Sequence, residues 1–380
     1  MIPHLFYYIF VFLVFASICF DVFKSGGKRL YRRTYNITYF FLALLVAFRY
    51  GTGNDTPGYM YAFSLMPDLT HLSIQDFLIY RAMPGYVVLV ATVKQVFGEF
   101  VYLQILQAFL FFHSFYKLLS RLNLRRFYLL LAFYGYVYFA ELSGVRECFG
   151  LAFIFYGLQY FIDRRYIRYY LFVLLAILMH AGMFIFLALP LIRLFRSLSG
   201  KNFLLLLVGS AIVLLSLNTI RSFLGLLDYG SIGRYAGSEG EGISVVSMIA
   251  NAIQLVIIYV FAIKKNKKET YPDFIYLGVI GIVVSIAGGL IPILYRYTAH
   301  FTIFYFYCMH AAISHIKKGQ EVYLIALLCL FYYSPLTRFL SSMSSSDRLQ
   351  YCSVFASDSS KAFFNKEIQS ATTEDLYRID

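Results

Sequence analysis

Short clusters of lysine and arginine divide this chain into long apolar runs. The clusters lie at residues 24–33, 117–126, 164–168, 193–201 and 264–268, with a weaker one at 317–318, and together they hold 21 of the 33 basic residues. Short basic loops are translocated poorly, so this pattern is typical of the cytoplasmic loops of a polytopic membrane protein. The net charge of +13 therefore indicates membrane orientation and contact with anionic headgroups, and gives no indication of nucleic-acid binding.

The composition between the clusters fits a membrane protein better than soluble domains. Hydrophobic residues make up 60% of the chain and charged residues only 14%. Apolar runs of about 20 residues can cross a bilayer, because a helix satisfies its own backbone hydrogen bonds. We therefore predict an all-α fold class, a polytopic membrane helical bundle of about 12 transmembrane helices. The predicted spans lie near residues 3–22, 36–50, 100–118, 127–141, 147–162, 167–180, 181–195, 203–220, 244–263, 273–291, 295–315 and 321–336.

Alternation of these spans gives a consistent orientation. If residues 24–33 are cytoplasmic, the amino terminus is outside and every basic cluster falls inside. This requires that residues 84–97 do not cross. That run is short and carries Lys94, so it is predicted to be a re-entrant or interfacial helix on the outer side. The runs 167–180 and 181–195 meet almost without a loop, which indicates a tight outer turn or one long broken helix.

The predicted organisation is a transmembrane domain over residues 1–340, followed by a polar tail over 341–380. Two outer loops of the domain, 51–83 and 221–242, are long, and long loops on a rigid scaffold tend to carry function. The tail begins with a Ser-rich stretch. We expect it to be weakly ordered and to lie outside.

Basic residues near the outer half of the predicted bundle are candidates for binding an anion. Arginine presents a planar, permanently charged fork that suits phosphate oxygens, so several arginines around an outer cavity would fit a lipid-linked diphosphate. The alternative is snorkelling at a span end or pairing with an acid, which we favour for Arg81, Lys94 and Arg221. The full set is Arg49, Arg81, Lys94, Arg146, Arg221, Arg234 and Arg296.

Arg49 lies in the sequence FRYGTGNDTPGYMYAF at 48–63. The two glycines permit a sharp turn, which would return Asp55 toward Arg49. Tyr59 and Tyr61 would then offer aromatic faces and hydroxyls to sugar rings. A Gly- and Asn-rich turn after a span is also common without any function.

A second charged group, Arg146 with Glu147, lies between two aromatic-rich spans. Ser143 is a candidate N-cap, which would place both charges in the first turn of the following helix. Acids flank Arg146 on both sides, so a simple ion pair is the alternative. Charges at the edge of hydrocarbon are costly, which favours a functional role for Arg146.

Two further candidates lie at span ends. His180 closes the apolar run FVLLAILMHAG, where a lone histidine is commonly a hydrogen-bonded packing residue. Facing the arginines, His180 would instead donate to phosphate or accept a proton near neutral pH. Arg296 follows Pro292, and a proline at that point starts or kinks a helix, which would direct Arg296 toward the bundle interior.

Motifs for cofactor chemistry are missing from the sequence. It contains no Walker or Rossmann glycine loop, no HExxH, no GxSxG and no Cys/His metal cluster. We therefore expect no cofactor, neither a nucleotide nor a metal. The five cysteines show no paired spacing and are interpreted as small core residues.

Three segments together resemble a known family. The turn at 48–63 is similar to the Arg–Gly–Asp–Tyr–Phe pattern that opens the outer loop of EpsG-like and Wzy-type bacterial polysaccharide polymerases. Residues 144–192 resemble its second signature, in which an arginine starts a span, a basic inner turn follows and a histidine ends the next span. The sequence LYRYTAHFTIFYF at 294–306 resembles its late span of arginine and aromatic residues. The resemblance covers roughly residues 1–335.

This resemblance implies a glycosyltransferase of GT-C-like architecture in the bacterial inner membrane, with its active site toward the periplasm. Such polymerases transfer a growing glycan from undecaprenyl diphosphate to the next lipid-linked repeat unit, which extends O-antigen or capsular polysaccharide. The implied partners are the undecaprenyl-diphosphate-linked oligosaccharide and the lipid bilayer, with a chain-length regulator as a further candidate and no nucleic acid. By position, the resemblance carries over Arg49, Asp55, Tyr59, Arg146, His180 and Arg296 as site residues.

The catalytic hypothesis follows from charge. Arginines would stabilise the departing diphosphate, and tyrosines would contact the sugars. The acceptor hydroxyl needs a base, for which His180, Asp55 and Glu147 are available; His180 is favoured because histidine titrates near working pH. The substrate-binding candidates are Arg49, Arg296, Arg234, Tyr59 and Tyr61, beside Arg146 as the catalytic cation.

Two other functions remain as alternatives. A flippase for the same lipid-linked oligosaccharide would normally show two related halves, and none is visible in the sequence. A polysaccharide O-acyltransferase would need a cytoplasmic acyl-donor site, for which the inner loops are short and basic.

Overall fold

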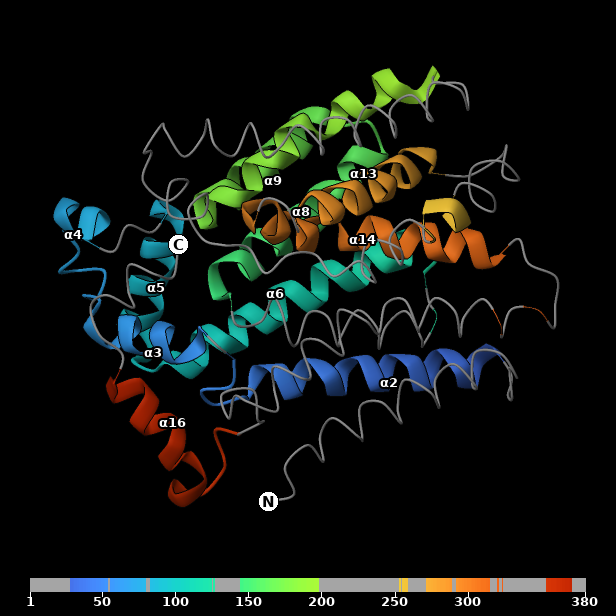
Figure 1. Ribbon diagram of the computed structural model, residues 1–380. Coiled ribbons are helices and arrows are strands. Elements are labelled where there is room, and N and C mark those ends of the chain that lie inside the picture. The colour runs from blue at the N-terminus through green and yellow to red at the C-terminus, as the bar shows by residue number, and fades with distance from the viewer. Residues whose placement is uncertain are drawn as a thin grey trace. The chain divides into compact units, whose positions relative to one another are not determined.

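The computed structural model of the chain contains two compact units, which are described separately: Met1–Leu187 with Leu336–Asp380, and Ala188–Pro335. The structure describes residues 28–53, 55–79, 83–124, 126, 144–197, 253, 255–258, 271–288, 292–314, 320, 323 and 353–370. Every regular element in these residues is a helix, as expected for the all-α class (Figure 1). Within the same residues, no helix combines the length and the apolar character needed to cross a membrane.

Four long helices form the body of the first unit within the residues that the structure describes. They are α2 (Lys28–Ala47), α6 (Phe100–Arg121), α8 (Val145–Ile162) and α9 (Tyr166–Met179). Helix α6 packs against both α2 and α8, and α8 packs against α9 (Figure 1). Phe155 of α8 lies 5.4 Å from Phe111 and 5.5 Å from Phe115 of α6, measured between ring centroids. These buried aromatic contacts hold the two helices together.

Shorter helices follow α2 in the region predicted to lie on the outer side, in the loop 51–83 and just after it. They are α3 (Thr56–Leu65), α4 (Ile74–Ile79) and α5 (Pro84–Phe97). Helix α5 has the same bounds as the predicted re-entrant or interfacial helix. Pro84 begins the helix and Gly98 ends it at φ 75°, a left-handed conformation that glycine adopts without strain. A core of buried residues joins α3 and α5 to the starts of α6 and α8.

The predicted break after residue 180 is confirmed, and it falls at His180. Helix α9 ends at Met179, and a 3₁₀ helix, η2 (Ala181–Ser197), begins after one residue. His180 has an extended backbone with φ −151° and ψ 126°. One non-helical residue is therefore enough to interrupt the long apolar run.

The boundary of the first described helix differs from the prediction. The span predicted at 36–50 is a helix that begins at Lys28 and ends at Ala47. The basic residues 28–33 were assigned to a loop, but they form the first turns of α2 because Lys and Arg are good helix formers. The predicted spans 3–22, 127–141 and 203–220, together with most of 244–263 and 321–336, lie outside the described residues.

The polar tail contains a helix within the residues that the structure describes. Residues 358–370 form helix α16 (Asp358–Ser370), which packs against α3 (Figure 1). Ser353 forms an antiparallel bridge with Arg49. Charge patterning alone could not reveal this contact, because it joins residues far apart in the sequence.

In the described part of the second unit, α13 (Pro272–Gly288) and α14 (Pro292–Ser314) pack along one another. Glycines on α13 permit this close approach: a Cβ at Gly278 would lie 2.3 Å from Cys308 Sγ. Arg193 Nε donates to Asp273 Oδ2 at 3.1 Å at one end of the pair. Cys148 and Cys308 are buried free thiols, as predicted for core cysteines, and the other three lie outside the described residues.

Candidate active site around Arg146 and Tyr59

Arg146 lies in the first turn of α8 with only 6% of its surface exposed. Its Nε donates to the hydroxyl oxygen of Tyr59 at 3.3 Å, and its guanidinium carbon lies 5.8 Å from the centre of the Tyr59 ring. The placement of Arg146 and Glu147 in the first turn is confirmed. The N-cap prediction is wrong by one residue, because Gly144 rather than Ser143 takes the non-helical conformation before the helix.

Tyr59 lies at the centre of the charged group. It is buried on α3, and its ring meets Tyr86 of α5 edge-on with centroids 6.2 Å apart. Burial raises the pKa of Tyr59 above its ordinary value, and Arg146 opposes this shift. The negative charges of Asp55 and Glu147 also raise this pKa, so both carboxylates lie within electrostatic reach of the phenol. The structure therefore brings together four predicted site residues from two distant motifs.

Asp55 and Glu147 differ in their surroundings. Asp55 is exposed and occupies the N-cap position of α3, where its carbonyl accepts the Tyr59 amide at 3.0 Å. Glu147 is half-buried in the first turn of α8. An acid at a helix N-terminus is stabilised in its charged form by the helix dipole. Both carboxylates are therefore favoured in the ionised form.

Arg49 precedes the turn that carries Asp55 and is almost completely buried, at 1% exposure. Its guanidinium donates to the Val46 carbonyl at 2.8 Å and to Gln107 Oε1 of α6 at 2.9 Å. The predicted sharp turn follows, with Gly51 at φ 62° and Gly53 at φ 113°. Only glycine adopts such backbone angles readily, which explains the two glycines of the motif.

Gln107 was not predicted as a site residue. It is fully buried on α6, and Gln104, one turn earlier on the same helix, is buried as well. Two glutamines three residues apart within an apolar helix lie on one face, and buried amides need partners. This spacing was the available signal for a buried polar site beside Arg49.

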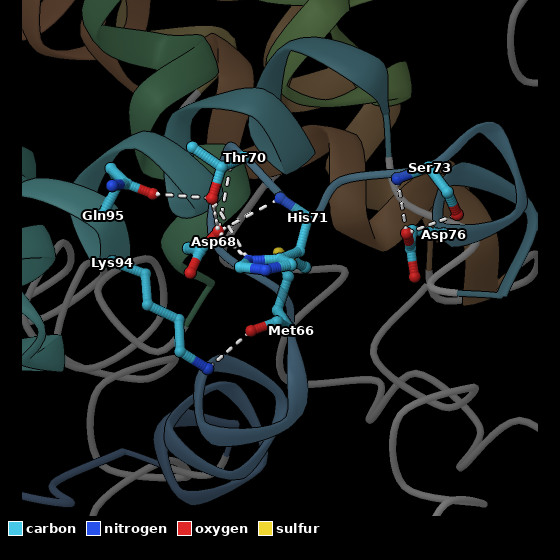
Figure 2. Close-up of polar contacts among 8 residues, drawn as sticks. All are labelled: Met66, Asp68, Thr70, His71, Ser73, Asp76, Lys94 and Gln95. Carbon is cyan, nitrogen blue, oxygen red and sulfur yellow. Dashed lines mark hydrogen bonds and ion pairs between the residues drawn. The ribbon is translucent and has the colours of Figure 1, made fainter.

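Lys94 contacts backbone carbonyls, and not the acid or the membrane interface that the sequence predicted for it. Its Nζ donates to the carbonyls of Phe63, Ser64 and Met66 at 3.0, 2.8 and 2.5 Å. These carbonyls lie at the end of α3, where they lack helical partners, and a cation is favourable there. Figure 2 shows Lys94 directed at Met66. Lys94 thus fastens α5 to the helix that carries Tyr59.

The connection between α3 and α4 is closed by local polar contacts (Figure 2). Asp68 Oδ1 accepts the Thr70 hydroxyl at 2.6 Å and lies 2.7 Å from His71 Nδ1. These hydrogen bonds to Thr70 and His71 lower the pKa of Asp68 to about 2. Ser73 and Asp76 form a similar pair at the start of α4, with the Ser73 hydroxyl donating to Asp76 Oδ2 at 2.7 Å. Both contacts are exposed and belong to turns.

The residues that flank His180 contact helix α8 and the core around Tyr59. Met179 before it packs against the core that contains Tyr59, and a Cβ at Gly150 would lie 2.8 Å from Met183 Cγ. The Gly182 amide donates to His180 Nδ1 at 3.1 Å. In the neutral ring Nδ1 is then the acceptor and the proton is on Nε2. This geometry favours His180 as a hydrogen-bond donor through Nε2 and is unfavourable for a base.

The structure describes the remaining candidates less fully. Tyr61 lies on α3 and is half-buried. Arg296 lies in the first turn of α14 in the second unit, where only its backbone position is described. The expected helix start after Pro292 is confirmed. Arg81, Arg221 and Arg234 lie outside the described residues.

Comparison with known proteins agrees with the resemblance drawn from the motifs. No curated protein and no solved structure matches the chain. The model of the EpsG family matches residues 32–353. This range covers most of the chain and contains every candidate site residue from Arg49 to Arg296. The chain therefore belongs to the EpsG family.

Proposed function

We propose that the protein is a glycosyltransferase that polymerises undecaprenyl-diphosphate-linked oligosaccharide repeat units into O-antigen or capsular polysaccharide. Membership of the EpsG family supports a polysaccharide-polymerase-like role in association with a membrane. The observation that carries the proposal is the buried Arg146–Tyr59 contact, with the carboxylates Asp55 and Glu147 acting on the same phenol. A cation beside two acids suits glycosyl transfer from a diphosphate.

The proposed reaction forms one glycosidic bond and breaks one glycosyl–phosphate bond. The hydroxyl oxygen of the acceptor sugar attacks the anomeric carbon of the donor glycan, and the bond from that carbon to the diphosphate oxygen breaks. Undecaprenyl diphosphate leaves with the electron pair, and the hydroxyl proton passes to a base. No step requires an oxidant, a nucleotide or a metal.

Arg146 is the proposed group for stabilising the leaving diphosphate. Its guanidinium lies at the N-terminus of α8, where the helix dipole adds positive potential. A preorganised cation acts on charge that develops in the transition state, which is the largest contribution in many enzymes. Arg49, Arg234, Arg296 and Tyr61 remain proposed substrate-binding residues from the sequence.

Asp55 and Glu147 are the proposed bases, with His180 as a donor to phosphate or sugar oxygens. Asp55 is exposed and can reach an incoming hydroxyl, and Glu147 lies in the same turn as Arg146. The Gly182 amide donates to His180 Nδ1, so a neutral His180 carries its proton on Nε2, the atom proposed as the donor. This assignment departs from the preference for His180 as base that composition and pKa alone suggested.

The location of the site is part of the proposal. The basic clusters support about 12 crossings of a bacterial inner membrane, with the 48–63 motif and Arg146 facing the periplasm. A reporter fused after Asp55 should read periplasmic and one after Lys265 cytoplasmic. A cytoplasmic Asp55 would overturn this orientation.

The decisive experiment is the glycan ladder of cells that lack this gene. Loss of a polymerase leaves the acceptor core with a single repeat unit, whereas loss of a flippase leaves none. Loss of an O-acyltransferase leaves a complete ladder of unacylated repeats. Complementation by the wild-type chain should restore the ladder, and any outcome other than the single-repeat product would overturn the proposal.

A further inference from the structure

The segment after Ser353 pairs with the turn that carries Arg49. Ser353 and Arg49 form an antiparallel bridge, and the Val354 amide donates to the Phe48 carbonyl at 2.9 Å. The rings of Phe48 and Phe355 lie 5.2 Å apart. The chain thus returns from its far end to pair with the first residues of the 48–63 motif.

Helix α16 adds side-chain contacts to the same turn. The Tyr50 hydroxyl donates to Asn365 Oδ1 at 2.6 Å, and Lys361 Nζ lies 5.2 Å from the centre of the Tyr50 ring. Helix α16 also packs against α3, which carries Tyr59 (Figure 1). Residues on both sides of Gly51 and Gly53 are therefore held by the carboxy-terminal segment.

This segment lies almost entirely outside the match to the EpsG family. The match ends at residue 353, where the bridge to Arg49 begins. A glycine-containing turn has many accessible backbone conformations, so holding Arg49 in one place requires contacts from outside the turn. Within the described residues, α6 supplies one such contact through Gln107, α2 supplies another through the Val46 carbonyl, and the carboxy-terminal segment adds those at Phe48 and Tyr50.

We propose that residues 353–370 form a strap that positions the Arg49 turn for substrate binding, with Asn365 as a positioning residue that acts through Tyr50. The proposal depends on the proposed function only for the expected change in KM. It also requires the strap to lie on the same side of the membrane as Asp55. The predicted spans between the two segments are even in number, which agrees with this requirement.

The first test measures the pairing without reference to activity. In an antiparallel pair of this hydrogen-bonding pattern, Cα atoms lie about 4.5 Å apart, within the range that a disulfide can bridge. The full-length double variant Arg49→Cys/Ser353→Cys, with Cys352→Ser and a protease site inserted near residue 345, should remain one band after cleavage until it is reduced. Two fragments without reduction would overturn the strap.

The side of the membrane is tested on a chain that keeps Arg49. The exposed residue Lys366 of α16 is replaced by cysteine, and its labelling by a membrane-impermeant maleimide is measured in spheroplasts and in inverted vesicles. We expect the Lys366→Cys variant to be labelled in spheroplasts, as an Asp55→Cys variant is. Labelling at opposite sides would overturn the proposal even if polymer formation is normal.

The kinetic test uses purified chain with lipid-linked repeat units. Asn365→Ala should raise KM by about threefold to tenfold, as expected for one hydrogen bond, with a much smaller change in kcat. Asn365→Asp keeps the acceptor oxygen and should restore KM, and Lys366→Ala is the matched control on the same helix. An unchanged KM in Asn365→Ala would refute positioning. If the wild-type chain has no polymerase activity although the strap pairs with the Arg49 turn, the proposed function is refuted and the strap is not.

Discussion

The contribution of Arg49 to stability can be measured through its hydrogen bond to Gln107. Arg49 is buried at 1% exposure and donates to Gln107 Oε1 at 2.9 Å. A hydrogen bond to a charged group contributes about 1.5–3 kcal/mol to stability, and a buried polar group left unpaired costs about 1–3 kcal/mol. Arg49→Met and Gln107→Leu should each lower the free energy of unfolding by at least about 1.5 kcal/mol.

A double-mutant cycle isolates the pair from other effects of the two substitutions. The second bond of Arg49, to the Val46 carbonyl, is lost in both variants that lack the arginine and therefore cancels. The remaining coupling free energy should be about 1.5–3 kcal/mol, which is roughly a 10- to 150-fold change in the unfolding equilibrium. The measurement is denaturant unfolding of the four purified chains in detergent.

The exposed pair of Arg121 and Asp163 provides the control within the same chain. Both side chains are more than one-third exposed, and such pairs usually couple by about 0–1 kcal/mol. If the cycle at Arg49 and Gln107 is additive within about 0.5 kcal/mol, the buried bond does not hold the turn. Arg49 would then be free to act mainly on substrate, and the structural reasoning for its burial would be refuted.

Three further predictions concern the proposed active site. Arg146→Lys keeps the charge but loses the Nε donor to Tyr59, so kcat in vitro should fall about 10²-fold at a normal protein level. Full-length polymer from this variant would refute the role of Arg146 in stabilising the leaving diphosphate. His180→Gln keeps a donor, so activity should stay within about tenfold of wild type; a fall of about 10²-fold or more would restore His180 as the base. Because burial raises the pKa of Tyr59, its phenol stays protonated across the assay range, and Tyr59→Phe should leave the alkaline limb of the pH–rate profile unchanged. A shift of that limb would show that Tyr59 ionises during turnover.

The sequence predicted helix boundaries well where a proline or a glycine constrains the backbone. Pro84 and Gly98 bound α5 because proline favours the first helical position and glycine adopts the left-handed conformation after the last. Helix α8 begins two residues before its predicted span, and α9 one residue before. The start of α2 was misplaced because charge was used to assign residues 28–33 to a loop, although charge does not prevent helix formation.

Long-range contacts explain what the sequence could not show. The motifs identified Arg49, Asp55, Tyr59 and Arg146, and the structure adds which of them meet. The acceptor for Arg49, Gln107, lies 58 residues away on another helix, and no local pattern pairs the two. The strap at 353–370 is polar and looked weakly ordered, because its partners lie more than 300 residues earlier.

The Arg146–Tyr59 contact is difficult to explain by stability alone. Residues 59 and 146 belong to separate motifs 87 positions apart, and they meet within a core otherwise formed by apolar and aromatic side chains. A buried charge loses its hydration, and well-packed apolar residues in its place are often equally or more stable. The helix dipole also opposes a cation at the N-terminus of α8, so Arg146 occupies a position that is unfavourable on both counts. An anion bound there would interact favourably with both the guanidinium and the dipole, in keeping with the role proposed for Arg146.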